Sequence, residues 1–177
     1  MATGDPREGN SPRGAVVDQK TVRKVNALID DAVAKGEKII AGQKSDSVLM
    51  AATVIDHVTN DMKIYREESF GPVVAIIRAK DEADAIRIAN DSEYGLSAAV
   101  FTKDSARGLR VARQIQSGIC HVNGSTVHDE AQMPFGGVGA SGYGRFGGKA
   151  GIDQFTELRW ITICLLYTSP SPRDLYQ

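Results

Sequence analysis

Residues 73–123 read VVAIIRAKDEADAIRIANDSEYGLSAAVFTKDSARGLRVARQIQSGICHVN, and their order of apolar and polar stretches decides the fold class. Short apolar runs at 73–78, 96–101 and 119–123 predict strands, and the amphipathic stretches between them predict helices. A strand–helix–strand–helix–strand order is typical of βαβ crossovers, which are right-handed in parallel sheets. We therefore expect an α/β fold with a mainly parallel sheet and flanking helices.

The two helices of this region have recognisable ends. Asp81 stands where an N-cap belongs, for a helix that runs through Asn90. Asp104 begins the second helix, which Gly118 is expected to close. The run 73–78 is apolar on both faces, which is typical of a strand buried in a parallel sheet.

Upstream of this region, Asp18 and Gly36 mark the ends of a further helix. The apolar residues between them recur at helical spacing, at Val22, Val25, Leu28 or Ile29, and Ala32. The other expected elements are strands at 38–41 and 49–58, a long loop at 124–148, a helix at 150–155 and a strand at 158–163.

The composition argues against several classes of protein. The 177 residues carry 21 Lys and Arg against 22 Asp and Glu, a net charge of −1, so we expect no nucleic-acid partner. The longest apolar run, 161–167, is too short to span a bilayer, and residues 1–14 lack the apolar core of a secretory signal. Two cysteines are too few for a disulfide framework or a zinc ribbon, and we expect a reduced, cytoplasmic setting.

Glycine is concentrated in the loop, where seven of the 18 glycines fall between positions 136 and 148. Residues 137–142 and 142–147 each match G-x-G-x-x-G, the fingerprint of dinucleotide-binding folds. That fingerprint must directly follow a strand, whereas the nearest expected strand ends at Asn123. We interpret these glycines instead as positions where the loop backbone approaches another part of the protein closely.

Three stretches, in order, resemble motifs of the aldehyde dehydrogenases. Residues 67–72 (EESFGP) resemble E-E-x-F-G-P, residues 89–96 (ANDSEYGL) resemble A-N-x-x-x-Y-G-L, and residues 133–145 (MPFGGVGASGYGR) resemble P-F-G-G-x-x-x-S-G-x-G-R. Residues 4–6 resemble the G-D-P that follows the family's nucleophilic cysteine. The resemblance covers residues 1–163 and implies the C-terminal third of such an enzyme, part of its catalytic domain.

The resemblance implies oxidation of an aldehyde to the carboxylic acid through a cysteine thioester, with NAD or NADP as cofactor. The family's catalytic cysteine, general-base glutamate and Rossmann segment have no counterpart here, so the chain alone is expected to be inactive. The string 122–148 is most similar to the aromatic-aldehyde members, the salicylaldehyde, vanillin and benzaldehyde dehydrogenases. Two alternatives stay open: a non-catalytic oligomerisation or interaction module, and a CoA-acylating semialdehyde dehydrogenase of the same fold.

The first motif implies two cofactor-binding residues. Glu68 should accept hydrogen bonds from the two hydroxyls of the nicotinamide ribose, because a carboxylate offers two acceptor oxygens. Phe70 should pack against the nicotinamide or its ribose. The alternatives are a solvated glutamate and a core phenylalanine that precedes a strand.

The loop is implied to wall the tunnel that admits the small-molecule aldehyde. Asn123 and Phe135 flank this loop, and Phe135 offers a flat apolar face to a substrate or, alternatively, anchors the loop on the core. Val127 and His128, in the loop interior, are expected to determine substrate choice.

Cys120 is interpreted as a buried structural residue rather than a nucleophile. It lies on the expected strand 119–123 next to His121, and successive strand side chains face opposite sides. No metal is expected at the cluster of polar residues that follows, since no helical pair or triad spacing is present at His121, His128, Asp129 and Glu130.

The resemblance divides the chain into a catalytic-domain portion at 1–155, an oligomerisation strand at 156–163 and a tail at 164–177. The family's last strand pairs with a neighbouring subunit, so the intact parent is expected to be a homodimer or homotetramer. The tail contains two Ser-Pro sites, but CLLYTSPSPRD resembles a translated DNA-library adaptor, and we expect the tail to be non-native.

Overall fold

Two compact units make up the chain, residues 1–92 and residues 93–177. A computed structural model describes residues 3–9 and 11–163. In this described part, no helix is long and apolar enough to cross a membrane.

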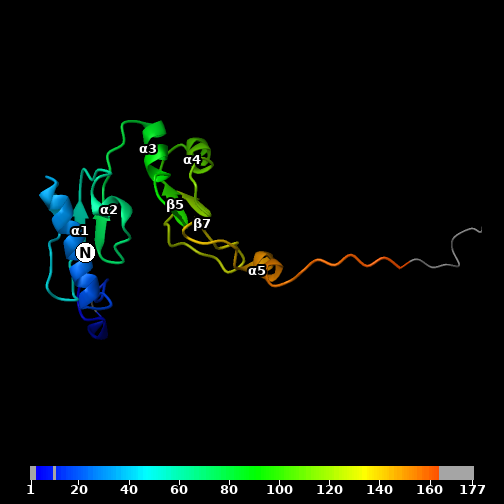
Figure 1. Ribbon diagram of the computed structural model, residues 1–177, viewed down its shortest axis with the longest axis horizontal. Coiled ribbons are helices and arrows are strands. Elements are labelled where there is room, and N and C mark those ends of the chain that lie inside the picture. The colour runs from blue at the N-terminus through cyan, green and yellow to red at the C-terminus, as the bar shows by residue number, and fades with distance from the viewer. Residues whose placement is uncertain (1–2, 10, 164–177) are drawn as a thin grey trace, which may run out of the picture. The chain divides into compact units, whose positions relative to one another are not determined.

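The first unit combines a small sheet with a long helix. Its elements in chain order are η1 (Pro6–Glu8), α1 (Gln19–Ala34), β1 (Ile39–Ala41), β2 (Thr53–Ile55), α2 (Lys63–Arg66), β3 (Val73–Ala75) and α3 (Glu82–Ala89). The strands lie in the order β1–β2–β3, with β1 antiparallel to β2 and β2 parallel to β3. Figure 1 shows α1, in blue, alongside the cyan strands of this sheet.

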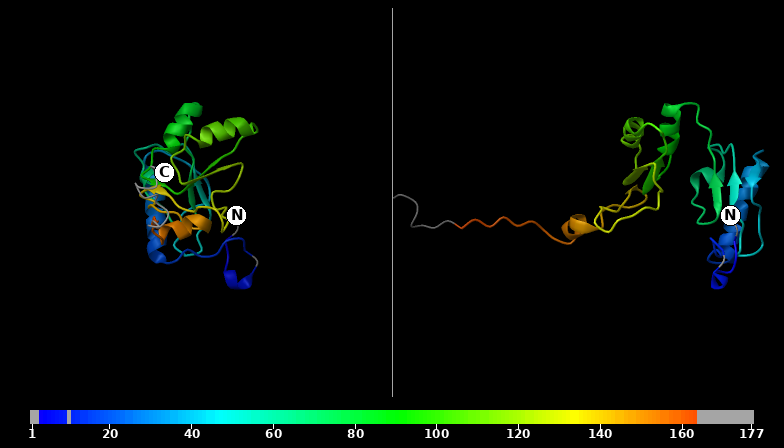
Figure 2. Two further views of the ribbon diagram at one scale, coloured as in Figure 1. Left: turned by 90° about the vertical axis from the view of Figure 1, so that its right-hand side faces the viewer. Right: turned by 180° about the vertical axis from the view of Figure 1, so that it is seen from behind.

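Helix α1 forms where the sequence predicts it. The Asp18 carboxylate accepts a hydrogen bond of 2.7 Å from the Thr21 amide, and Gly36 follows the helix with a φ of +98°. The predicted apolar stripe is the buried face of the helix, and Figure 2 shows the helix beside the sheet from behind. The core of the unit consists of Val22, Val25, Leu28, Ile29, Ala32, Met50, Ile55, Val58, Met62, Ile64 and Val73.

The second unit contains a parallel pair of strands and an antiparallel pair. Its elements are β4 (Tyr94–Gly95), β5 (Ser97–Val100), α4 (Ser105–Ala112), β6 (Ile119–Val122), β7 (Val138–Gly139) and α5 (Gly148–Gln154). Strands β5 and β6 are parallel, with Ser97 opposite Ile119 and Val100 opposite Val122, and α4 connects them. Strand β4 pairs with β7, which lies inside the glycine-rich loop.

The glycine-rich loop packs backbone against backbone, which confirms the interpretation of its glycines. A Cβ at Gly118 would lie 1.8 Å from the carbonyl oxygen of Gly136, and a Cβ at Gly136 would lie 2.4 Å from that of Gly144. Phe135 and Phe146 exchange backbone hydrogen bonds of 2.7 and 2.8 Å. The loop is therefore more regular than predicted, because close approach of its glycines lets it form strand and bridge hydrogen bonds.

The predicted α/β class is confirmed, but the described residues form small mixed sheets in place of the expected mainly parallel sheet. The described residues form three small sheets, in which β2–β3 and β5–β6 are parallel while β1–β2 and β4–β7 are antiparallel. Strands β3 and β5, which the alternating pattern assigns to one sheet, belong to different units. Apolar periodicity identifies a strand but does not select its partner, and this difference explains the error.

Two elements also differ from expectation in detail. The side chain of Val74 in β3 is 59% exposed rather than buried, because α1 covers only one face of this sheet. Helix α4 ends at Ala112, well before Gly118. The amides of Gln114 and Ile115 bond to carbonyls three residues back, which tightens the chain and ends the helix early.

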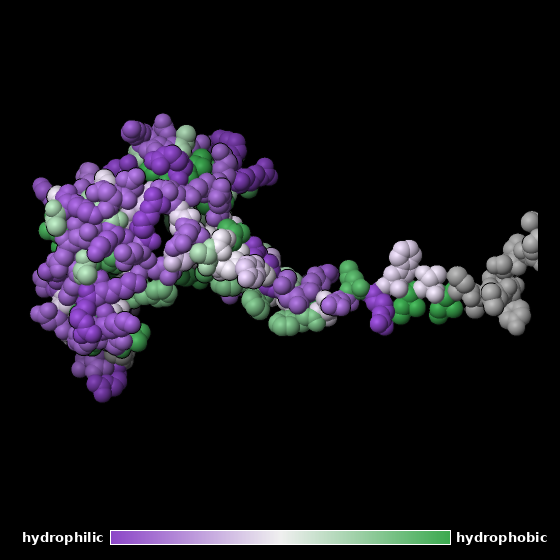
Figure 3. Space-filling model, viewed as in Figure 1, coloured by the Kyte–Doolittle hydropathy of each residue, from purple (hydrophilic) through white to green (hydrophobic). Residues whose placement is uncertain are grey.

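Residues 156–163 have neither helix nor strand, so the strand predicted at 158–163 is absent from the described part of the chain. Their large apolar side chains are exposed, namely Leu158, Trp160, Ile161 and Ile163. Figure 3 shows hydrophobic residues in green along this segment. Pairing with another subunit stays a prediction, as do the boundaries at 155 and 163. The predicted non-native tail, 164–177, lies outside the described residues.

Candidate functional site

Residues 67–70 connect α2 to β3 and carry both predicted cofactor residues. The Glu67 amide closes α2 by donating to the Lys63 carbonyl at 2.9 Å. Glu68 follows in an exposed position, and within the described residues its carboxylate has no hydrogen-bond or ion-pair partner. Both of its oxygens are therefore available to the hydroxyl groups of a ligand.

Phe70 has an unusual backbone and an exposed ring. Its φ is +46°, in the left-handed region, where a non-glycine residue costs about 1–2 kcal/mol. The side chain is 79% exposed, which contradicts the alternative of a core phenylalanine. With residues 13–17 and Pro72, Phe70 lines a surface hollow of about 370 Å³, so its ring can stack against a ligand bound there.

The residue that precedes the first motif stretch contacts the second motif stretch within the first unit. The Arg66 guanidinium, which directly precedes residues 67–72, binds the Asp91 carboxylate of stretch 89–96 through hydrogen bonds of 2.8 and 3.0 Å. The later residues of stretch 89–96 form β4, which pairs with β7 of the third stretch. The second motif stretch therefore contacts Arg66, next to the first stretch, through Asp91, and it contacts the third stretch through β4.

Asn123 ends β6 and directs the chain into the loop. Its φ is +59°, a left-handed conformation that asparagine tolerates. Its side-chain oxygen accepts from the Thr102 amide at 2.8 Å, and its side-chain nitrogen donates to the Thr102 carbonyl at 2.9 Å. The amide group is therefore occupied by backbone, and the residue shapes the entry to the loop.

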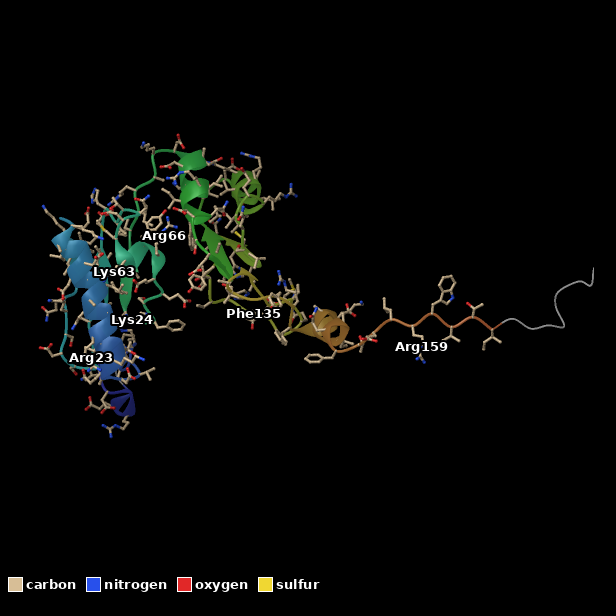
Figure 4. All side chains as sticks on the ribbon, viewed as in Figure 1. Arg23, Lys24, Lys63, Arg66, Phe135 and Arg159 are labelled. Carbon is tan, nitrogen blue, oxygen red and sulfur yellow. The ribbon has the colours of Figure 1, made fainter. Side chains whose placement is uncertain are left out.

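A cavity of about 380 Å³ lies beside β6 and contains two of the four predicted substrate residues, His128 and Phe135. This volume falls within the range of roughly 300–1,000 Å³ that is usual for small-molecule sites. Phe135 is labelled in Figure 4, and Met133 and Pro134 extend the apolar part of the lining. Val127, which is 86% exposed, and Asn123 do not line this cavity.

Two histidines make the cavity polar on one side. The rings of His121 and His128 meet edge to face with their centroids 5.7 Å apart, and His128 Nε2 lies 3.5 Å from a carboxylate oxygen of Glu130. His121 Nε2 is buried and has no hydrogen-bond partner among the described residues. Sequence reasoning gave His121 no binding role, because its proximity to His128 depends on the path of the loop rather than on sequence spacing.

Cys120 also lines this cavity, and burial raises the pKa of its thiol. The nucleophilic form of cysteine is the thiolate, so a raised pKa disfavours catalysis by this residue. Within the described residues, no three His, Cys, Asp or Glu side chains come together as a metal site would require.

The aldehyde dehydrogenase family model matches residues 1–161, and the chain belongs to this family. The chain is 52% identical over 163 residues to a vanillin dehydrogenase of Pseudomonas fluorescens, covering 92% of the chain and 34% of that protein. It is 50% identical over 164 residues to a salicylaldehyde dehydrogenase of Pseudomonas putida, with the same two coverages. The chain therefore spans about a third of the length of these relatives.

Solved structures of the same family match the fold. A salicylaldehyde dehydrogenase from Pseudomonas putida G7, complexed with salicylaldehyde, superposes with a TM-score of 0.88 at 48% identity, over 97% of this chain and 36% of that one. A Mycobacterium tuberculosis aldehyde dehydrogenase complexed with NAD⁺ gives 0.85 at 33% identity, over 96% and 36%.

The residues of segment 67–70 suit the nicotinamide cofactor of this family. The carboxylate of Glu68 is exposed and has no partner in the described part of the chain, as an acceptor for a ribose diol requires. The exposed ring of Phe70 lies beside a hollow in the same unit. The acceptor oxygens of Glu68 and the hollow beside Phe70 are therefore consistent with binding of the cofactor.

Proposed function

We propose that this chain is part of an enzyme that oxidises a hydroxylated aromatic aldehyde to its carboxylic acid with NAD⁺ or NADP⁺. The observation that carries the proposal is segment 67–70, which presents a carboxylate without a partner beside a phenylalanine held at positive φ. Identity of about half to vanillin and salicylaldehyde dehydrogenases supports the aromatic substrate class.

Glu68 and Phe70 would hold the cofactor. The Glu68 oxygens accept hydrogen bonds from the ribose diol, and the Phe70 ring packs against the ribose or the nicotinamide. Bound cofactor would supply the acceptor for the hydride of the aldehyde. The task of these two residues is to restrict its position, because hydride transfer needs near-contact distance.

The cavity beside β6 would hold the aldehyde. Phe135 offers a flat apolar face for the aromatic ring, while His128 and His121 provide nitrogens that can hydrogen-bond a ring hydroxyl. Val127 is exposed and lies outside the cavity lining, where it would select among aldehydes on entry. Asn123 contributes by turning the chain into the loop.

The experiment uses a hybrid enzyme, in which residues 1–163 replace the matching 34% of the Pseudomonas fluorescens vanillin dehydrogenase. We expect NAD⁺-dependent oxidation of vanillin and salicylaldehyde. Glu68→Gln should raise the KM for NAD⁺ about tenfold, the effect of losing one charge-assisted hydrogen bond, while the neighbouring Glu67→Gln serves as the matched control. His128→Ala should change the KM for the aldehyde and leave that for NAD⁺ unchanged.

Three results would count against this function. Equal effects of Glu68→Gln and Glu67→Gln would remove the cofactor role. A hybrid that needs coenzyme A and releases an acyl thioester would indicate the CoA-acylating alternative. Sustained NADH production by the 177-residue chain alone would contradict the expectation that it is inactive.

A further inference from the structure

Helix α2 is too short to be stable by itself. It has four residues, and an isolated helix of one turn does not persist in water. At its start, the Lys63 amide donates to the Asp31 carboxylate at 2.8 Å, and Ile64 is buried in the core. These contacts fix the start of α2, while the residues that lead into segment 67–70 lie at its other end.

The end of α2 is held by Asp91. Arg66 donates to the two oxygens of this carboxylate at 2.8 and 3.0 Å, and to the Asp91 carbonyl at 3.1 Å. The Tyr65 hydroxyl donates to the same carboxylate at 2.8 Å, and the Arg66 guanidinium lies 4.8 Å from the Tyr65 ring centre. A forked contact of this kind fixes orientation as well as distance.

The carboxylate of Asp91 is ionised at neutral pH. The Arg66 guanidinium, and after it the Tyr65 hydroxyl, hold the pKa of Asp91 below its ordinary value. The ion pair between Arg66 and Asp91 is therefore formed at neutral pH. Lys63 and Arg66, the first and last residues of α2, are labelled in Figure 4.

A second anchor lies on the other side of segment 67–70. A Cβ at Gly71 would lie 2.3 Å from Val25 Cγ2, so the backbone there is pressed against α1. The Pro72 carbonyl accepts a hydrogen bond of 2.8 Å from the Thr53 amide of β2. The four residues 67–70 are therefore held at one end by the contacts of Arg66 and at the other by the contacts of Gly71, and their position depends on both.

We propose that Asp91, acting through Arg66 and Tyr65, is a positioning residue that holds segment 67–70 in the form that binds the cofactor. The inference rests on the proposed cofactor role of Glu68 and Phe70. Loss of the Arg66–Asp91 contact frees one end of segment 67–70. The backbone of Phe70 would then relax, because a positive φ persists at a non-glycine residue only while its surroundings enforce it.

The test compares Asp91→Asn with Lys44→Gln in the hybrid enzyme. Lys44 forms an exposed ion pair with Asp30 in the same unit and serves as the matched control. For Asp91→Asn we expect a KM for NAD⁺ and a Kd for NADH, from fluorescence titration, about fivefold higher, with kcat and the aldehyde KM within about twofold. Amide hydrogen exchange at residues 67–70 should accelerate in the cofactor-free enzyme, and Lys44→Gln should change none of these values.

A second variant tests whether the NADH affinity can be rescued, and other results would overturn the positioning role of Asp91. The charge-exchanged variant Arg66→Asp/Asp91→Arg should recover part of the NADH affinity that Asp91→Asn loses. If Asp91→Asn does not fold, Tyr65→Phe removes only one hydrogen bond and should give the same pattern in weaker form. Unchanged exchange at 67–70, or equal losses for cofactor and aldehyde, would overturn the proposal. Glu68→Gln without effect on NADH affinity would instead overturn the cofactor role itself.

Discussion

At the scale of single residues, Phe70 combines an unfavourable backbone with an exposed ring. Glycine adopts a φ of +46° without strain, so Phe70→Gly should be more stable than Phe70→Ala by about 1 kcal/mol. Urea denaturation of the hybrid enzyme measures this difference. Both variants should bind NADH more weakly, because both remove the ring.

Tyr143 provides the control for this prediction. Its side chain is 97% exposed, and it is not among the three non-glycine residues of the described chain that have positive φ. At this position alanine should be at least as stable as glycine, since glycine loses more conformational entropy on folding. The same preference for glycine at both positions would show that strain at Phe70 is not the cause.

The residues proposed to bind the cofactor can be selected from the sequence, but their surroundings cannot. The E-E-x-F-G-P pattern directs attention to Glu68 and Phe70. The positive φ of Phe70 and the contact between Arg66 and Asp91 depend on non-local packing that leaves no local signal. His121 was likewise considered only as a metal ligand, and its place in the cavity follows from the return of the loop.

At the scale of elements, the start of β6 depends on Gly118, whose lack of a side chain lets the Gly136 carbonyl approach closely. Gly118→Ala would bring a Cβ against the Gly136 carbonyl, and backbone cannot move aside as a side-chain end can. We expect a loss of about 2 kcal/mol in unfolding free energy, within the usual range for overpacking. Thermal and urea denaturation of the hybrid enzyme measure it.

Gly151→Ala is the matched control for this variant. Gly151 lies inside α5, and the nearest atom to a new Cβ would be 4.0 Å away. Alanine has the higher helix propensity, so this variant should be neutral or slightly stabilising. Equal destabilisation by both substitutions would contradict the role of close backbone packing at Gly118.

Element positions were largely predictable, and their pairing was not. Caps and apolar spacing place α1 and α3 within a residue or two, because these signals are local. The same signals extend α4 to Gly118 and merge β3 and β5 into one sheet, and the structure contradicts both. Strand partners are chosen by contacts distant in sequence, which apolar periodicity does not encode.

At the scale of the whole molecule, segment 156–163 exposes a run of large apolar side chains, which is typical of a surface that binds another protein. If it pairs with another subunit, the double variant Leu158→Ser/Trp160→Ser should convert the assembled hybrid enzyme into protomers. Sedimentation velocity distinguishes the two states. Val17→Ser, which changes a single apolar residue that is 94% exposed, should leave the assembly intact.

The family could be recognised from three motifs, whereas the division into units could not be predicted. Each motif is short and local, so one sequence is enough to recognise it. The division at residue 92 falls inside the second motif stretch, with Asp91 bound in one unit and β4 paired in the other. No change in composition marks that boundary, so the sequence predicts a single catalytic portion there.

The backbone packing of residues 136–148 limits which positions of this loop can change. Positions such as Gly136, Gly144 and Gly147 accept no side chain without collision or strain. Mutation there would therefore disrupt the backbone packing of the loop before it changed the residues that face a ligand. The neighbouring positions 125–130 are exposed, so substitution there meets no comparable backbone collision. If the loop selects the aldehyde as proposed, these six positions are the ones to randomise in a library.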